Sequence, residues 1–173
     1  MTSKIELWGW EKKPRTMLRH IKVGDIVCFE IDKSGTKFGY GQLISKLKTG
    51  GFVLKAMNIV HNNPNDITIY EVLNSDLFGK PCILDAYTAF DKKMTKNGEW
   101  RIIGREIEFI ANKEDLDSIY FVYGINGYKK RINLLNEEEI ISDMEADNYP
   151  DAGINTGDQV KMWYIKYNNS IFT

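Results

Sequence analysis

Apolar residues recur at alternate positions of residues 21–31, which makes one apolar face of a strand. The apolar positions of this stretch are Ile21, Val23, Val27, Phe29 and Ile31. Turn-forming residues follow it, and apolar-rich stretches return at 38–47 and 52–60 with a second turn between them. The pattern predicts three consecutive strands joined by short turns, a β-meander.

Further strand-like stretches continue toward the C-terminus. We predict strands at 67–73, 82–90, 99–109, 119–124, 128–134 and 158–167, the last with a helix as the alternative. The dipeptides Asn97-Gly98 and Asn126-Gly127 are typical hairpin turns, and the second separates two predicted strands. The polar residues 111–118 predict a short helical turn or a loop.

One segment has the pattern of a helix. Asn136 is a suitable N-cap, Glu139 occupies the capping-box position, and the apolar residues Ile140, Ile141 and Met144 follow at helical spacing. The helix is expected to end before Pro150, because the residue before a proline avoids the α conformation.

Together these elements predict a mainly β (α+β) fold. We expect a curled antiparallel sheet, or a partly open barrel or sandwich, with one or two short helices, one of them near the C-terminus. Short loops between neighbouring strands require antiparallel pairing. The barrel and the open sandwich remain alternatives, because local patterns do not specify strand order.

Composition indicates a soluble protein of the cytoplasm. The chain contains nine Tyr, eight Phe and four Trp, a composition that favours strands over disorder. We find neither a signal-like apolar stretch at the start nor an apolar run long enough to span a membrane. Cys28 and Cys82 lie in apolar, strand-like segments, so we expect buried thiols and no disulfide.

The candidates for catalysis are few. His20 and His61 each stand alone, whereas a zinc site needs three or four ligands, so no metal is expected. A pairing of either cysteine with a histidine remains a minor alternative. No glycine-rich phosphate-binding motif is present, and the alternate glycines Gly39 and Gly41 indicate a strand that another ring or backbone approaches closely. We therefore predict a protein that is not an enzyme and uses no cofactor.

Charge is strongly polarised along the chain although the net charge is only −1. Basic residues dominate the first sixty positions, and residues 133–159 contain no Lys or Arg. The acidic stretch is either a solvated helix face with an acidic loop or a polyanionic surface that binds a basic groove. Under the second reading the candidate partner-binding residues are Glu137, Glu138, Glu139, Asp143, Glu145, Asp147 and Asp151.

The basic N-terminal part suggests nucleic-acid binding as an alternative. Trp8 and Trp10 precede a cluster of Lys and Arg, and stacking rings with cations are how single strands are held. The two rings share one face of an extended segment, however, which suits core packing. We expect no direct contact with nucleic acid, and a nucleic-acid-binding β-barrel module is kept as an alternative.

Two groups of short motifs resemble a known family. The strand Ile21-Lys22-Val23-Gly24-Asp25-Ile26-Val27 is followed by the return strand Phe38-Gly39-Tyr40-Gly41-Gln42-Leu43-Ile44, and Glu99-Trp100-Arg101-Ile102-Ile103-Gly104 comes later. This series is similar to the "Lys-x-Gly-Asp-Ile", "Tyr-Gly-x-Gly" and "Trp-x-x-Ile-Gly" elements of the bacterial immunity proteins of family twenty-six. On this reading residues 1–173 form a single immunity-type domain, with a family-like β core at 20–110 and an acidic helix and loop at 136–158.

The resemblance implies a function. Such a protein binds and neutralises a cognate toxin of a polymorphic, contact-dependent growth inhibition system in the cytoplasm, without catalysis. Toxins of these systems are often nucleases, so the expected partner is an RNase or DNase domain whose active site or substrate groove is blocked. Related proteins are labelled phosphotriesterase-like, so a small metal-dependent hydrolase is an alternative; the scarcity of histidine argues against it.

Overall fold

Seven strands form the larger of two sheets in the computed structural model, which describes residues 4–32, 34–76, 79–92 and 99–167. Their order is β1-β6-β2-β3-β4-β5-β10, and every neighbouring pair is antiparallel except the parallel pair β5–β10. The strands are β1 (Lys4–Leu7), β2 (Asp25–Glu30), β3 (Phe38–Lys46), β4 (Phe52–His61), β5 (Cys82–Leu84), β6 (Trp100–Ile107) and β10 (Ile154–Asn155). The predicted meander is confirmed as β2-β3-β4, and the sheet is mixed and not a closed barrel.

Irregular pairing curls this sheet. The register shifts between Ile26 and Val27 on β2, and twice along β3, first between Gly39 and Gly41 and then between Leu43 and Ser45. A Cβ at Gly39 would lie 2.7 Å from the ring of Phe29, and one at Gly41 would lie 2.9 Å from the backbone oxygen of Lys55. The predicted close approach at both glycines is therefore confirmed.

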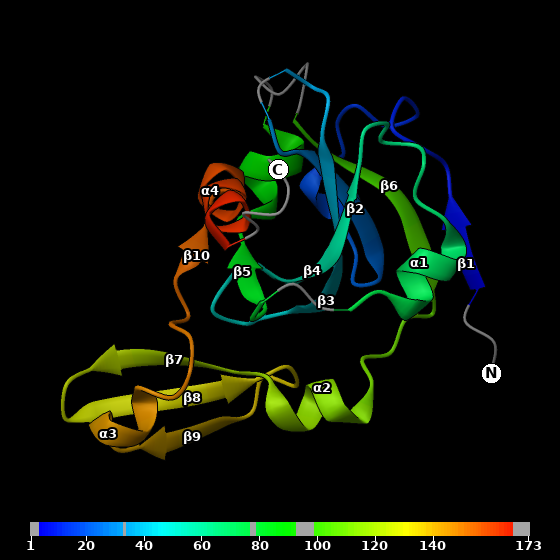
Figure 1. Cartoon of the computed structure of the whole chain (residues 1–173). Coiled ribbons are helices and arrows are strands. Elements are labelled where there is room, and N and C mark those ends of the chain that lie inside the picture. Colours follow the sequence, from blue (N-terminus) through cyan, green and yellow to red (C-terminus); the bar gives the residue numbers. More distant parts are fainter. Residues whose placement is uncertain (1–3, 33, 77–78, 93–98, 168–173) are drawn as a thin grey trace.

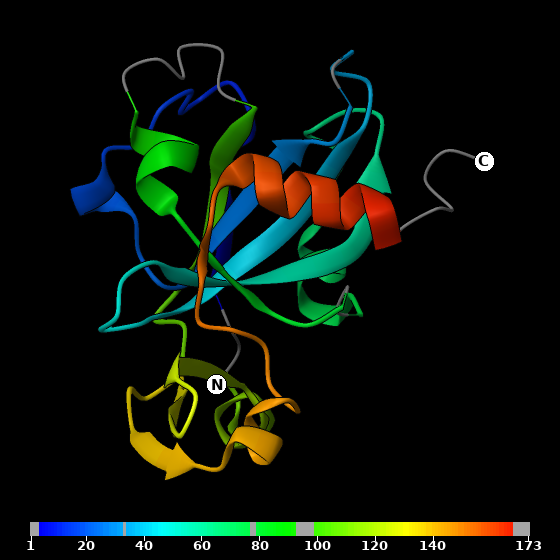
Figure 2. The same ribbon diagram turned by 90° about the vertical axis from the view of Figure 1, so that its left-hand side faces the viewer.

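Both faces of the larger sheet are covered. The apolar positions predicted for residues 21–31 lie on one face, where Val27 and Phe29 pack with Val160 and Tyr164 of α4 (Gly157–Tyr167). The opposite face buries Ile26 and Cys28 together with α1 (Ile69–Asn74), which contributes Val72. Figures 1 and 2 show α4 and α1 on opposite sides of the sheet. Because β2 is buried on both faces, it forms the centre of the fold.

The smaller sheet consists of β7 (Tyr120–Ile125), β8 (Tyr128–Asn133) and β9 (Glu138–Ile141), all antiparallel. The predicted Asn126-Gly127 turn joins β7 to β8, and α2 (Lys113–Ser118), with Asn112 as N-cap, precedes β7. The sheet lies at one end of the larger one (Figure 1), where Phe121 and Ile132 pack with Ile44, Val53 and Ile83.

The helix predicted from residue 136 is wrong. Asn136 has a φ of +64° and lies in the turn between β8 and β9, where Asn133 accepts hydrogen bonds from the backbone of Leu135 and Glu137. Glu138–Ile141 is therefore a strand, and the helix that follows is only α3 (Asp143–Ala146), capped by Ser142. Asn133 and Asn136 both favour a turn here, and strand pairing with β8 outweighs the helical pattern.

Three predicted strands are also corrected. Residues 67–73 contain helix α1, which begins with a capping box between Thr68 and Glu71. In 82–90 only β5 is extended, and a π-helical turn η2 (Tyr87–Asp91) follows, with Asp85 accepting hydrogen bonds from Tyr87 and Thr88. Residues 158–167 belong to α4, as in the helical alternative predicted for this segment. Thr156 and Gln159 form a capping box at its start, in which each side chain accepts a hydrogen bond from the backbone N–H of the other residue.

The remaining elements agree with the sequence. The strands predicted at 99–109, 119–124 and 128–134 are β6, β7 and β8, and the polar stretch 111–118 contains α2. A 3-10 turn, η1 (Leu18–His20), precedes β2. The predicted turn at Asn97-Gly98 lies outside the described residues.

Candidate binding surface

The acidic segment, residues 137–151, lies on the smaller sheet. Glu138 and Glu139 belong to β9, Asp143 and Glu145 to α3, and Glu137, Asp147 and Asp151 to the adjoining turns. In Figure 1 β9 is the outermost strand and α3 lies against the same sheet. The structure therefore brings the seven predicted carboxylates to one part of the molecule, on a strand and a short helix instead of one long helix.

Glu138 is held by three groups. It accepts a hydrogen bond from the Tyr123 hydroxyl and forms ion pairs with Lys48, at 3.1 Å, and Lys130, at 3.4 Å. The hydrogen bond from Tyr123 and the contact with Lys48 lower the pKa of Glu138 to about 2. The same contact raises the pKa of Tyr123 to about 12. Glu138 is thus a fixed anion at neutral pH.

Arg131 organises the other face of the smaller sheet. Its guanidinium donates to Glu139 over 2.9 and 2.5 Å, to Glu145 over 3.1 Å and to the Tyr149 hydroxyl over 2.5 Å. It also lies 4.7 Å from the ring centre of Tyr120. One planar cation therefore connects β9, α3 and the loop that follows α3.

The other carboxylates serve the local backbone or remain open. Asp143 accepts from the N–H of Gly127 at 3.0 and 2.8 Å, Glu137 accepts from the Asn133 amide, and Asp151 accepts from the N–H of Gly153. Asp147 is exposed, and in the described part of the chain no hydrogen bond or ion pair holds its side chain.

Sequence reasoning missed the cations that lie beside this segment. Lys130 and Arg131 are on β8 and Lys48 follows β3, so each is outside the acidic stretch in the sequence but against it in space. The sequence does contain a signal for this pairing. An Asn-Gly hairpin followed by a second Asn-rich turn predicts a third strand that is antiparallel to the basic strand β8. The segment is therefore a charge network with excess carboxylates and not a uniform acidic face.

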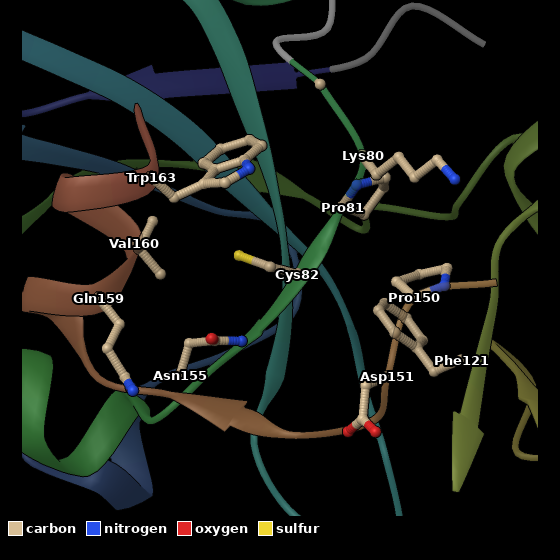
Figure 3. A pocket seen from close by; sticks show the side chains of 11 residues that line it. Lys80, Pro81, Cys82, Phe121, Pro150, Asp151, Asn155, Gln159, Val160 and Trp163 are labelled. Atoms are coloured by element: carbon tan, nitrogen blue, oxygen red, sulfur yellow. The ribbon is translucent and has the colours of Figure 1, made fainter. Parts of the chain in front are cut away.

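A hollow of about 640 Å³ borders this segment, between β5, α4 and the residues that lead into β10 (Figure 3). Apolar and polar groups share the lining, which comprises Gly79, Lys80, Pro81, Cys82, Phe121, Pro150, Asp151, Asn155, Gln159, Val160 and Trp163. The sulfur of Cys82 points into it (Figure 3). Such a hollow has the size and chemistry to receive an apolar side chain of a partner.

The thiols and histidines show no arrangement for catalysis. Burial raises the pKa of Cys82 to about 12 and the pKa of the buried Cys28 thiol well above its usual range, so both are protonated at neutral pH. His61 contacts Glu71 at 3.0 Å, and His20 is exposed. Among the described residues, no three His, Cys, Asp or Glu side chains are grouped to hold a metal ion.

The tryptophans near the N-terminus belong to the core. Trp10 is buried, stacks edge-on with Phe38 and lies under Arg101, whose guanidinium is 4.3 Å from the ring centre. Trp8 packs against the opposite core cluster, because Gly9, with a φ of +85°, turns the chain between the two rings. The expectation that they share one face is wrong, and the expectation of core packing is confirmed.

Comparison with known proteins identifies the family. The family model described as Immunity protein 26 matches residues 22–131, which is more than half of the chain. This chain belongs to the Immunity protein 26 family. The match extends from the start of the meander into β8, where it ends at residue 131, farther than the motifs at 20–110 indicated, and the acidic segment lies beyond it.

Membership in the Immunity protein 26 family means that the protein neutralises a toxin. No curated protein and no solved structure matches the chain. None of the helices in the described ranges has the length and apolar character needed to cross a membrane.

Proposed function

We propose that this immunity protein neutralises a nuclease toxin by tight, non-catalytic binding that covers the toxin's active site or substrate groove. The contact surface in this proposal is the acidic segment together with the hollow beside it. The observation that supports the proposal is the excess negative charge of this surface: it carries seven carboxylates against the five cations Lys48, Lys80, Lys129, Lys130 and Arg131.

The chemistry of a nuclease explains why a carboxylate surface would bind it. A nuclease binds a polyanion, so its substrate groove carries Lys and Arg. Fixed carboxylates offer those cations an alternative to phosphates, and charge complementarity accelerates association. Nuclease–immunity pairs can reach dissociation constants on the order of 10⁻¹³ M, with interfaces of roughly 1,600 Å².

The internal ion pairs support such binding. Lys130 and Arg131 restrain Glu138, Glu139 and Glu145, so that less side-chain entropy is lost when a partner docks. Glu139 keeps 61% of its side chain exposed while paired with Arg131. Glu139 and Asp147 are therefore two exposed carboxylates that a toxin can reach.

The proposal includes the setting in which the protein acts. The toxin is part of a polymorphic, contact-dependent system and is an RNase or DNase. The immunity protein meets it in the cytoplasm, where the nucleic acid has to be protected.

Neutralising these two carboxylates tests the proposed surface. The variant Glu139→Gln/Asp147→Asn should associate with the toxin domain encoded beside this gene at least about 10-fold more slowly at low salt, with a shallower dependence on salt. The matched control, Asp66→Asn/Asp76→Asn at exposed positions that flank α1, removes the same charge away from this surface and should change the rate less than about 2-fold. Equal rates for both variants would refute the acidic surface while leaving the immunity role to another face.

A further inference from the structure

The two edges of the smaller sheet differ. At the β7 edge the chain covers itself: the N–H of Val122 donates to the oxygen of Pro150 at 2.9 Å, and the N–H of Ala152 donates to the oxygen of Val122 at 2.7 Å. Val122 also forms a parallel bridge with Asp151. The segment that follows α3 therefore acts as a cap on this edge.

The β9 edge has no such cap. The N–H of Asn133 donates to the oxygen of Glu137 at 3.1 Å, and the pairs Arg131–Glu139 and Lys129–Ile141 continue that register. Hydrogen-bonded and non-bonded pairs alternate in an antiparallel ladder, so the N–H and C=O groups of Glu138 and Ile140 point away from β8. Within the described ranges no backbone group of another segment is bonded to them.

The side chains on β9 indicate what could pair there. Ile140 is 63% exposed on one face of the strand, and Glu139 is 61% exposed on the other. A second copy of this chain fits poorly. If its β9 paired antiparallel with this one through the N–H and C=O groups of both Glu138 and Ile140, Glu139 of one copy would lie directly opposite Glu139 of the other, and like charges would repel. An extended segment with a cation beside Glu139 and an apolar residue beside Ile140 fits both faces.

We infer that an extended segment of the toxin adds to β9 as a fourth strand of the smaller sheet. Backbone hydrogen bonds to Glu138 and Ile140 provide the affinity, and the side chains of Glu139 and Ile140 select the segment. This inference rests on the proposed function and specifies how part of the acidic segment engages its partner.

Proline at residue 140 tests the inference directly. An edge strand tolerates proline at a residue whose N–H points away from the sheet. The variant Ile140→Pro should therefore fold normally but lack an N–H that an added strand needs. We expect the Kd for an inactive form of the toxin domain encoded beside this gene to rise at least about 30-fold. The control Ile140→Ala, which keeps the N–H, should change the Kd less than about 10-fold.

Hydrogen exchange followed by NMR provides a readout independent of that variant. The amides of Glu138 and Ile140 should exchange rapidly in the free protein and become protected in the complex, while those of Glu139 and Ile141 are protected in both. A complex that forms without protecting Glu138 and Ile140 would overturn strand addition and leave the proposed function intact. If the unaltered protein does not bind the toxin domain at all, the proposed function itself fails.

Discussion

Arg131 and Glu139 face each other across β8 and β9, joined by two hydrogen bonds of 2.9 and 2.5 Å. The same guanidinium continues to Glu145 and Tyr149, so a residue of the family-matched region positions the segment that lies beyond it. The geometry of the acidic segment thus depends on a side chain outside that segment.

Two substitutions of Arg131 distinguish the contribution of its charge to stability from that of its planar guanidinium. Arg131→Lys keeps the charge but loses the planar fork, and should reduce the free energy of unfolding by about 1 kcal/mol in urea denaturation. Arg131→Met should cost about 2 kcal/mol, because several acceptors lose their donor together. Equal stability of all three proteins would show that the network contributes nothing to folding.

The buried ion pair between Lys55 and Asp115 joins β4 to α2 at 2.9 Å. Lys55→Met leaves the Asp115 carboxylate buried without its partner and should destabilise the protein by about 3 kcal/mol. The double variant Lys55→Met/Asp115→Leu should recover most of that loss in the same urea assay. A double variant as unstable as the single one would mean that packing, and not the unpaired charge, causes the effect.

Glycine at position 39 is required by space. Gly39→Ala places a methyl group 2.7 Å from the Phe29 ring. It should lower the free energy of unfolding, measured by heat or urea, by about 2 kcal/mol. Gly127→Ala is the control for conformation alone, because no atom lies within 4 Å of its added carbon but its φ is +79°. It should cost about 1 kcal/mol. If Gly39→Ala is as stable as the unaltered protein, the close approach at Gly39 is relieved without strain.

Low pH should reduce the stability of the folded protein, in part because Glu138 becomes protonated. Its pKa in the folded state is about 2, below the ordinary value of 4.5, so its contribution is complete above pH 4.5 and is lost as the pH falls toward 2. Unfolding measured across this window should show a shallower loss of stability for Glu138→Gln than for the unaltered protein. Parallel curves for the two proteins would contradict the lowered pKa.

The sequence predicted the elements whose local and tertiary preferences agree. Apolar residues recur at alternate positions through β2, and its neighbours are separated by Gly- and Asp-containing turns, so the meander follows from local pattern alone. Asn126-Gly127 likewise determined the β7–β8 hairpin. The strand order, with β6 between β1 and β2, depends on contacts between residues far apart in the sequence, which no local pattern contains.

The acidic segment shows why the site was harder to predict. The run that begins at Asn136 satisfies a helix pattern, but the positive φ of Asn136 and the side chain of Asn133 make it a turn. The real helix signals were the pairs Thr68 with Glu71 and Thr156 with Gln159, each of which caps a helix predicted as a strand. The acidic composition did identify the carboxylates, but not the cations that pair with them.

Titration of toxin activity distinguishes stoichiometric binding, the mode of action that we propose for this protein, from catalysis. The activity of a fixed amount of the cognate toxin domain, which we propose is a nuclease, is measured while the immunity protein is added. For stoichiometric binding, we expect the activity to fall in proportion to added protein and to reach zero near one equivalent. Complete loss at a small fraction of an equivalent, as an enzyme acting on the toxin would produce, or full activity in the presence of excess protein, would contradict it.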